Sequence, residues 1–307
     1  NLDLGQVYYN STANAFKVTK TVLGTGAWAS GGNLNSARNT LSGLGTQTAA
    51  LAVSGSTGSP SVLVESYNGT SFTEVNDVNA YRNLAAASGT TAAGLFFGGT
   101  TGSVSALNES WNGSSWTEVN EMNTGRQMLG GSGVATASIA VGGYTTTDVA
   151  NVETYNGSSW TEITDINTAR RGLSNVGTIT ASLAMGGKTS GNVGIVEQWN
   201  GTSWTEVADF NQTRNIFGAA GVTTSALAFG GANGPTAGSY AQTESWNGSS
   251  WTEVADLATA RQALASAGSS SSALGAGGTT DGGSTIIANT EEWTVPSSTA
   301  NQTIGSS

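Results

Sequence analysis

Arginine is the residue whose type and spacing most suggest chemistry in this sequence. The chain has seven Arg, and six recur at steps of 44, 44, 44, 44 and 47 residues. These six are Arg38, Arg82, Arg126, Arg170, Arg214 and Arg261. Because a guanidinium group holds a carboxylate or sulfate through two parallel hydrogen bonds, six such groups in a ring could bind an acidic ligand.

The same guanidinium groups could instead pair with acids that repeat alongside them. One repeated acid lies five residues before an Arg, at Asp77, Glu121, Asp165, Asp209 and Asp256. The other opens a short motif containing aromatic residues, at Glu65, Glu109, Glu153, Glu197, Glu244 and Glu291. The match in number favours internal pairing, so a structural role for the Arg ring is the alternative to anion binding.

The composition argues against most catalytic chemistry. The chain contains no His and no Cys, which removes the commonest general base, the commonest metal ligands and a thiolate nucleophile. We therefore expect no enzyme, no cofactor and no metal site. The formal net charge of −10 and the scattered Lys and Arg argue against nucleic-acid binding. No run of about 18 apolar residues occurs, so membrane insertion is not expected.

The elements that must position these residues are repeated as well. The motif reads ESWNGSSWTEV at residues 109–119 and 244–254 and ETYNGSSWTEI at 153–163, and the steps between its first Glu residues are 44, 44, 44, 47 and 47. Periods of 40 to 50 residues indicate a propeller or a solenoid. In the unit that follows Arg214 we expect four strands, at 217–221, 226–231, 243–248 and 249–254. The last two would be joined at Asn247-Gly248 by a type I′ turn, which needs positive φ at both central residues.

Six units of four strands predict an all-β chain folded as a six-bladed β-propeller of antiparallel blades, with the small-residue first strands innermost. A β-solenoid is the alternative. The last unit lacks its fourth strand, but Trp28 stands ten residues before Arg38, as Trp116 stands before Arg126. We therefore expect the N-terminal strand to complete the last blade and close the ring. The predicted domains are an N-terminal arm (1–25), the propeller (26–295) and a polar C-terminal tail (296–307).

The repeated Arg, the double glycine after the second strand and the paired aromatic strands resemble the kelch repeat over residues 26–295. The Trp- and Asn-Gly-rich sequence of the repeats, together with the opening segment GQVYYNSTANAFKVTK, also resembles the sequences of propeller domains in structural proteins of tailed bacteriophages, especially marine ones. Kelch propellers serve as scaffolds, receptors and enzymes, so this resemblance implies a fold rather than an activity. The copper centre of enzymes resembling galactose oxidase needs His and Cys, which this chain lacks. A sialidase needs three specialised Arg residues, whereas the six Arg here recur at one equivalent position.

Residues that differ between repeats are where a specific function would lie. The loops after the glycine pairs are small and polar, and the bulky or charged candidates for contacts in them are Tyr144, Lys188 and Tyr240. The paired tryptophans could stack on sugars or pack between blades. The NGS and NGT triplets match glycosylation acceptors but also fit hairpin turns.

These observations predict a non-enzymatic structural or binding propeller on a larger assembly, a phage virion, with an extracellular or virion location. The N-terminal arm would bind other virion proteins, and the variable loops would contact neighbouring subunits or a host-surface glycan. The alternatives are a sugar-binding propeller of a secreted bacterial protein and a glycosidase of sialidase type.

Overall fold

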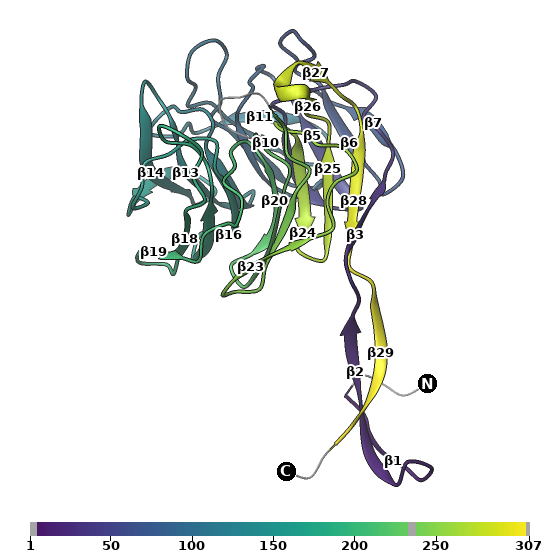
Figure 1. The fold of residues 1–307 in the computed structure, drawn as a ribbon. Helices are drawn as coiled ribbons and strands as arrows, with labels where there is room; N and C mark the ends of the chain where they lie inside the picture. The colour runs from purple at the N-terminus through teal and green to yellow at the C-terminus, as the bar shows by residue number, and fades with distance from the viewer. Residues whose placement is uncertain (1–4, 233–237, 305–307) are drawn as a thin grey trace.

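The computed structural model describes residues 5–232 and 238–304 of the chain. They form a head, residues 26–295, and a narrow stem that projects from one side of it (Figure 1). Apart from one 3-10 turn, η2 (Asp281–Gly283), the elements of the described residues are strands. No helix in this described part is long and apolar enough to cross a membrane.

The head contains six antiparallel sheets of four strands each among the described residues. In chain order the first three are β4 (Ser42–Thr46), β5 (Ala49–Val53), β6 (Val64–Tyr67) and β7 (Phe72–Val75); β8 (Ala86–Gly89), β9 (Gly94–Phe97), β10 (Asn108–Trp111) and β11 (Trp116–Val119); and β12 (Gly130–Val134), β13 (Ala137–Tyr144), β14 (Asp148–Tyr155) and β15 (Trp160–Ile163). The other three are β16 (Ser174–Thr178), β17 (Ala181–Met185), β18 (Val196–Trp199) and β19 (Trp204–Val207); β20 (Gly218–Val222), β21 (Ser225–Phe229), β22 (Thr243–Trp246) and β23 (Trp251–Val254); and β24 (Ala265–Ser269), β25 (Ser272–Ala276), β28 (Thr290–Thr294) and β3 (Ala27–Ser30). A two-stranded ribbon, β26 (Thr279–Thr280) with β27 (Thr285–Ile286), decorates the sixth sheet.

The core lies between neighbouring sheets rather than inside any one of them. The second strand of each sheet is an apolar run such as ALAF that is buried on both faces, as expected for a strand with a sheet on either side. In one cluster, Ile139 and Val141 of β13 pack against Ala184 of β17 and against Trp199 and Trp204. The paired aromatic residues are therefore the filling between sheets, and this arrangement is that of a β-propeller.

The sixth sheet is completed from the other end of the chain, as the sequence predicted. Strand β3 pairs with β28 in antiparallel register, with Trp28 opposite Trp293. Trp28 also packs edge-on against Phe229 of the fifth sheet at 4.8 Å between ring centroids, and its Nε1 donates to Thr243 Oγ1 at 3.0 Å. The N-terminal strand thus packs its Trp against a Phe of the preceding sheet, as Trp160 in the fourth strand of the third sheet packs against Phe97.

The six first strands are linked by a circle of backbone hydrogen bonds. The residue two positions before each first strand donates its N–H to the carbonyl of the equivalent residue in the preceding sheet, at 2.7 to 3.1 Å. The circle runs through Thr40, Leu84, Met128, Gly172, Ile216 and Ala263, and Thr40 donates back to Ala263. All six have a left-handed φ, between 44° and 63°. Five of them are not glycine, so the repeated hydrogen bond maintains a conformation that side chains ordinarily disfavour.

The predicted type I′ turn is wrong. The third and fourth strands pair up to Trp246 opposite Trp251, which leaves a four-residue loop, and of its central residues only Gly248 has positive φ. The Asn247 side chain explains the difference, because its Oδ1 accepts from the N–H groups of Ser249 and Ser250, both at 2.9 Å. An Asn side chain that caps the loop in this way replaces the backbone hydrogen bonds of a tighter turn.

The stem is a three-stranded sheet built from both ends of the chain. Strand β1 (Val7–Asn10) pairs with β2 (Ala15–Leu23), and β2 pairs with β29 (Ser297–Thr303) from Leu23 opposite Ser297 to Lys17 opposite Thr303. The predicted N-terminal arm (1–25) and polar C-terminal tail (296–307) therefore pair with each other in one sheet, as far as the described residues go. Because β28 continues into β29 and β2 leads into β3, the stem stands where the other five sheets have their Asn-Gly loop.

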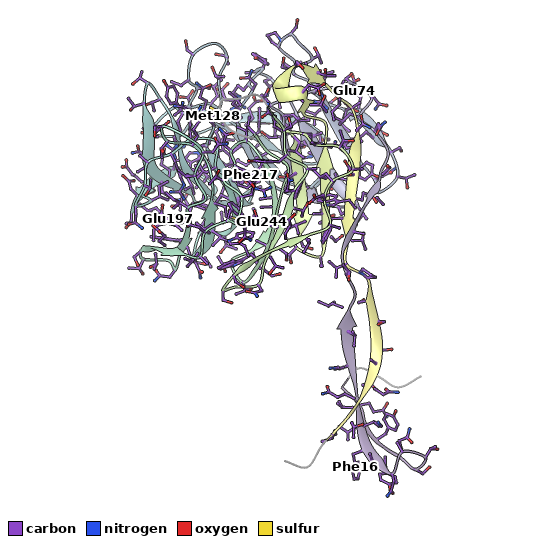
Figure 2. The ribbon with its side chains drawn as sticks, viewed as in Figure 1. Phe16, Glu74, Met128, Glu197, Phe217 and Glu244 are labelled. Atoms are coloured by element: carbon purple, nitrogen blue, oxygen red, sulfur yellow. The ribbon has the colours of Figure 1, made fainter. Side chains whose placement is uncertain are left out.

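The stem leaves the head on the side opposite the variable loops (Figure 1). The ribbon β26–β27 marks the far side, and there six short bridges join each linker to the loop after a glycine pair. We call that side the loop face. Met128 of the hydrogen-bonded circle lies toward it, whereas Phe16 lies at the far end of the stem (Figure 2).

Candidate functional site

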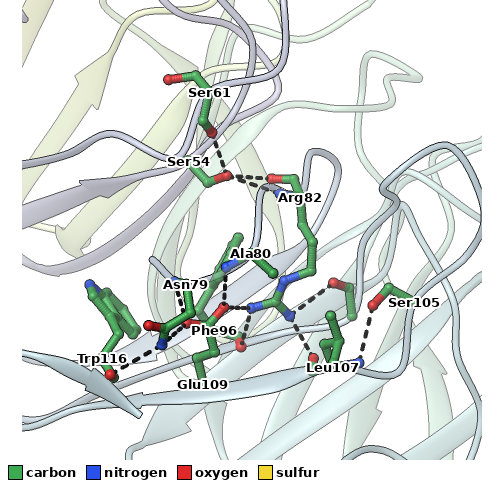
Figure 3. Close-up of polar contacts among 11 residues, drawn as sticks. Ser54, Ser61, Asn79, Ala80, Arg82, Phe96, Ser105, Leu107, Glu109 and Trp116 are labelled. Atoms are coloured by element: carbon green, nitrogen blue, oxygen red, sulfur yellow. Dashed lines mark hydrogen bonds and ion pairs between the residues drawn. The ribbon is translucent and has the colours of Figure 1, made fainter. Parts of the chain in front are cut away.

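The six repeated arginines are fully buried and paired with the Glu of the aromatic motif. Figure 3 shows one of these pairs, in which Arg82 donates to Glu109 Oε1 at 2.8 Å. The side chains are 0 % and 2 % exposed. The other pairs have the same partners in each repeat: Arg38–Glu65, Arg126–Glu153, Arg170–Glu197, Arg214–Glu244 and Arg261–Glu291.

Each pair also fixes the linker between two sheets. Arg82 donates to the carbonyls of Leu107 and Gly98, and Glu109 accepts from the backbone N–H of Asn79 at 2.7 Å and from its side chain at 2.8 Å. The carbonyl of Arg82 accepts from the Ser54 hydroxyl at 2.7 Å, whereas in the other five repeats the carbonyl of the repeated Arg accepts from a glycine N–H of the preceding sheet, as Gly99 donates to Arg126 at 2.9 Å. The same contact between Gly278 and Arg38, at 2.8 Å, joins the sixth sheet to the first.

Burial dominates the electrostatics of five of these arginines. It lowers the pKa of Arg82, while the charge of Glu109 and its hydrogen bond act in the opposite direction. The pKa values of Arg38, Arg126, Arg214 and Arg261 are lowered for the same reason. A guanidinium with no exposed surface and an internal carboxylate cannot hold an external anion, so the structure places the six predicted arginines in a structural role.

The predicted acids that lie five residues before an arginine have another role. Asp77 accepts from the N–H of Val64 at 3.2 Å, and Asp165, Asp209 and Asp256 make the equivalent contact at the start of their third strands. These carboxylates satisfy a backbone donor where the third strand begins. They are not the ion-pair partners of the arginines.

The centre of the head contains a cavity of about 140 Å³. Its lining combines apolar side chains, among them Leu84, Met128 and Ile216, with the backbone of the first strands. The lining residues include no Asp, Glu, Lys, Arg or Tyr. The polar side chains there are engaged internally: Asn175, for example, donates to Ser132 Oγ at 2.7 Å and accepts from Ser182 Oγ at 2.9 Å.

The paired tryptophans are not exposed for stacking on a ligand. Trp111 and Trp116 are 3 % and 6 % exposed, with ring centroids 5.2 Å apart. Trp246 and Trp251 have the same tilted arrangement at 5.3 Å. Of the two alternatives raised by the sequence, these residues take the packing role.

The three predicted loop residues lie on the loop face, and the aromatic rings of two of them lie next to arginine guanidinium groups. The Arg171 guanidinium lies over the Tyr144 ring, 4.7 Å from its centroid. Tyr240 accepts from Gln212 Nε2 at 2.5 Å and lies near the Arg214 guanidinium. Lys188 pairs through its backbone with Arg171. The loop that contains Tyr240 follows the glycine pair Gly230-Gly231, and residues 233–237 of it lie outside the described residues.

Arg171 is the residue that the sequence analysis did not single out. It is the seventh arginine, outside the repeated position, and its Nη1 donates to Asp148 Oδ1 at 2.7 Å with 26 % of its side chain exposed. With six arginines buried in pairs, Arg171 and Lys188 are the remaining basic residues of 26–295. Its signal in the sequence was its departure from the amide side chains, Asn or Gln, that all other repeats carry at this position.

The described residues contain no group of three or more acidic, His or Cys side chains that could hold a metal ion. The chain matches no protein-family model and no curated protein. It is similar in structure to YjhT, with a TM-score of 0.72, 12 % sequence identity, and coverage of 87 % of this chain and 99 % of that one. At this identity the similarity shows the fold alone, a β-propeller-like fold.

Proposed function

We propose that the six sheets are the blades of one closed six-bladed propeller of kelch-like design, and that it serves as a non-enzymatic binding module on a larger assembly. Three sets of contacts support closure between the sixth sheet and the first. Thr40 donates to Ala263, Gly278 donates to Arg38, and the buried Gln47 donates to the carbonyl of Trp293 at 2.6 Å.

The observation that carries the functional proposal is the stem. A sheet of three strands must pack one face against something to be stable in water, and the described residues offer no second layer along it. Residues opposite one another in a ladder share a face, so Val7 with Val18 and Tyr9 with Phe16 form an apolar surface. Val7, Tyr9 and Phe16 are 55 %, 51 % and 57 % exposed.

An apolar stem on one side and variable loops on the other suit a module that is anchored at the stem and presents its loop face. We propose that another protein of the assembly covers the stem and that the assembly is a virion, in line with the phage resemblance of the sequence. The non-enzymatic assignment is supported by the central cavity, whose lining has no titratable side chain. A sialidase mechanism has little support, because the six repeated arginines are buried in ion pairs.

The test is to isolate the native particle and to identify its polypeptides by mass spectrometry. We expect several copies of this chain per particle. Phe16→Ser in the full chain should abolish its incorporation while leaving the circular dichroism and melting temperature of the head unchanged. Val222→Ser is the matched control, because Val222 is also half exposed, at 50 %, but lies in the head. A chain found free and monomeric, or a Phe16→Ser variant incorporated normally, would refute the proposal.

A further inference from the structure

We infer that the loop face carries a binding site for a carboxylate-bearing ligand, formed by Arg171 and Lys188. The inference deepens the proposed function, since it depends on the loop face being the one presented to a target. It begins from the six equivalent bridges that surround the central opening on this face.

Five of the six bridges pair uncharged residues, and one pairs two cations. The neutral pairs are Asn39–Ser56, Asn83–Thr100, Gln127–Tyr144, Asn215–Ala232 and Gln262–Thr279, and the charged pair is Arg171–Lys188. The two backbones exchange hydrogen bonds of 2.7 and 3.1 Å, so the two side chains leave the ribbon on the same face. Like charges placed directly opposite one another destabilise a ladder.

The fold does not require this charge, because five repeats build the same bridge without it. Departures from a pattern that the fold otherwise repeats are expected at functional sites. The surroundings increase the contrast, since residues 26–295 carry nineteen acidic and eight basic residues, and six of the basic ones are buried in pairs. One small cationic spot therefore remains on a strongly acidic head.

The geometry of Arg171 leaves part of its guanidinium available. The plane is held against the Tyr144 ring, and Asp148 occupies a single amino group, Nη1. With Lys188 nearby, the local charge of these three ionised groups is +1. A preoriented guanidinium with free donors, next to an ammonium, is suited to a carboxylate.

The test uses the full chain and two trisaccharides, tri-galacturonate and its neutral counterpart galactotriose, in isothermal titration calorimetry. We expect tri-galacturonate to bind at least about ten-fold more tightly than galactotriose, and its affinity to fall as NaCl is raised. Arg171→Gln should lower the affinity about ten-fold or more, and Lys188→Gln several-fold, because each removes a charge-assisted contact. Arg171→Gln should fold normally, since two other repeats carry Gln at this position.

Gln127→Asn, at the equivalent position of the preceding sheet, is the matched control and should bind as the wild type does. Equal binding of the two sugars, unchanged affinity in Arg171→Gln, or no heat with about 10 mM tri-galacturonate would overturn the inference. Sodium sulfate competing as strongly as the trisaccharide would overturn the assignment to a carboxylate. The stem variants report on anchoring separately, so failure of the carboxylate site and failure of the assembly role are distinguishable.

Discussion

The buried Arg82–Glu109 pair allows a quantitative test of how the head is held together. In Glu109→Gln the side chain keeps its size but loses its charge, so Arg82, with no exposed surface, would remain as an uncompensated buried cation. Three further donors depend on the same carboxylate: the N–H and the side-chain amide of Asn79, and the N–H of Ala80. Removing one partner of a buried pair costs about 3 to 5 kcal/mol.

This cost is large compared with the total stability of a folded domain, about 5 to 15 kcal/mol. In a chain of this length we expect about 2 °C per kcal/mol, so the melting temperature of Glu109→Gln should fall by about 6 to 10 °C. The assay is differential scanning calorimetry combined with urea unfolding followed by tryptophan fluorescence.

Glu118→Gln is the matched control, because Glu118 lies opposite Glu109 in the same sheet and is exposed. It should change the unfolding free energy by less than about 0.5 kcal/mol. The double variant Arg82→Met/Glu109→Gln should be more stable than the sum of the single variants predicts, because the uncompensated charge is gone. If Glu109→Gln were no more destabilising than Glu118→Gln, the interpretation of the pairs as structural ties would be wrong.

Three further predictions concern closure of the head and its pH dependence. Trp28→Ala should destabilise the chain by about 3 to 5 kcal/mol in urea unfolding, because it removes an aromatic side chain packed between two sheets; a loss below about 1 kcal/mol would show that the N-terminal strand is dispensable. Gln47→Leu should cost about 1 to 3 kcal/mol, because it leaves the Trp293 carbonyl and the Ser272 hydroxyl without their partner, and Thr136→Leu, in the equivalent turn of another sheet, should cost clearly less. Burial and the hydrogen bond to Glu292 raise the pKa of Tyr67 from 10.0 to about 12, so the contribution of the Tyr67 hydroxyl to stability is complete below pH 10 and is lost as pH rises toward 12. Tyr67→Phe should therefore flatten the fall of the urea midpoint with pH over this window. An unchanged dependence of the midpoint on pH would contradict the prediction.

Much of the head could be predicted from the sequence because its contacts are periodic. The spacing of Glu and Arg located every sheet, and the position of Trp28 relative to Arg38 identified the strand that pairs with β28. The partner of each arginine was narrowed to two sets of acids, but spacing could not choose between them. The choice depends on which carboxylate lies beside the guanidinium once the third strand is buried.

What the sequence could not show falls into two kinds. The C-terminal strand β29 reads SSTANQT and has no apolar alternation, because its partner β2 supplies the apolar residues of the stem. The Arg171–Lys188 pair joins residues 17 positions apart that meet only because the linker and the loop form a bridge. Arg171 occurs once, so a search for repeated residues passes over it.

The pairing of β3 with β28 also sets an orientation that the repeats by themselves lack. In the six-bladed propeller proposed above, blades of nearly the same sequence are almost equivalent under rotation about the central axis, so the blades alone would define no azimuth. The stem removes this degeneracy, because it can leave only from the sheet in which the two chain ends meet. Every copy held by its stem would therefore present the Arg171–Lys188 bridge at the same angle to its support, with about a third of a turn of blades between the anchor and the bridge.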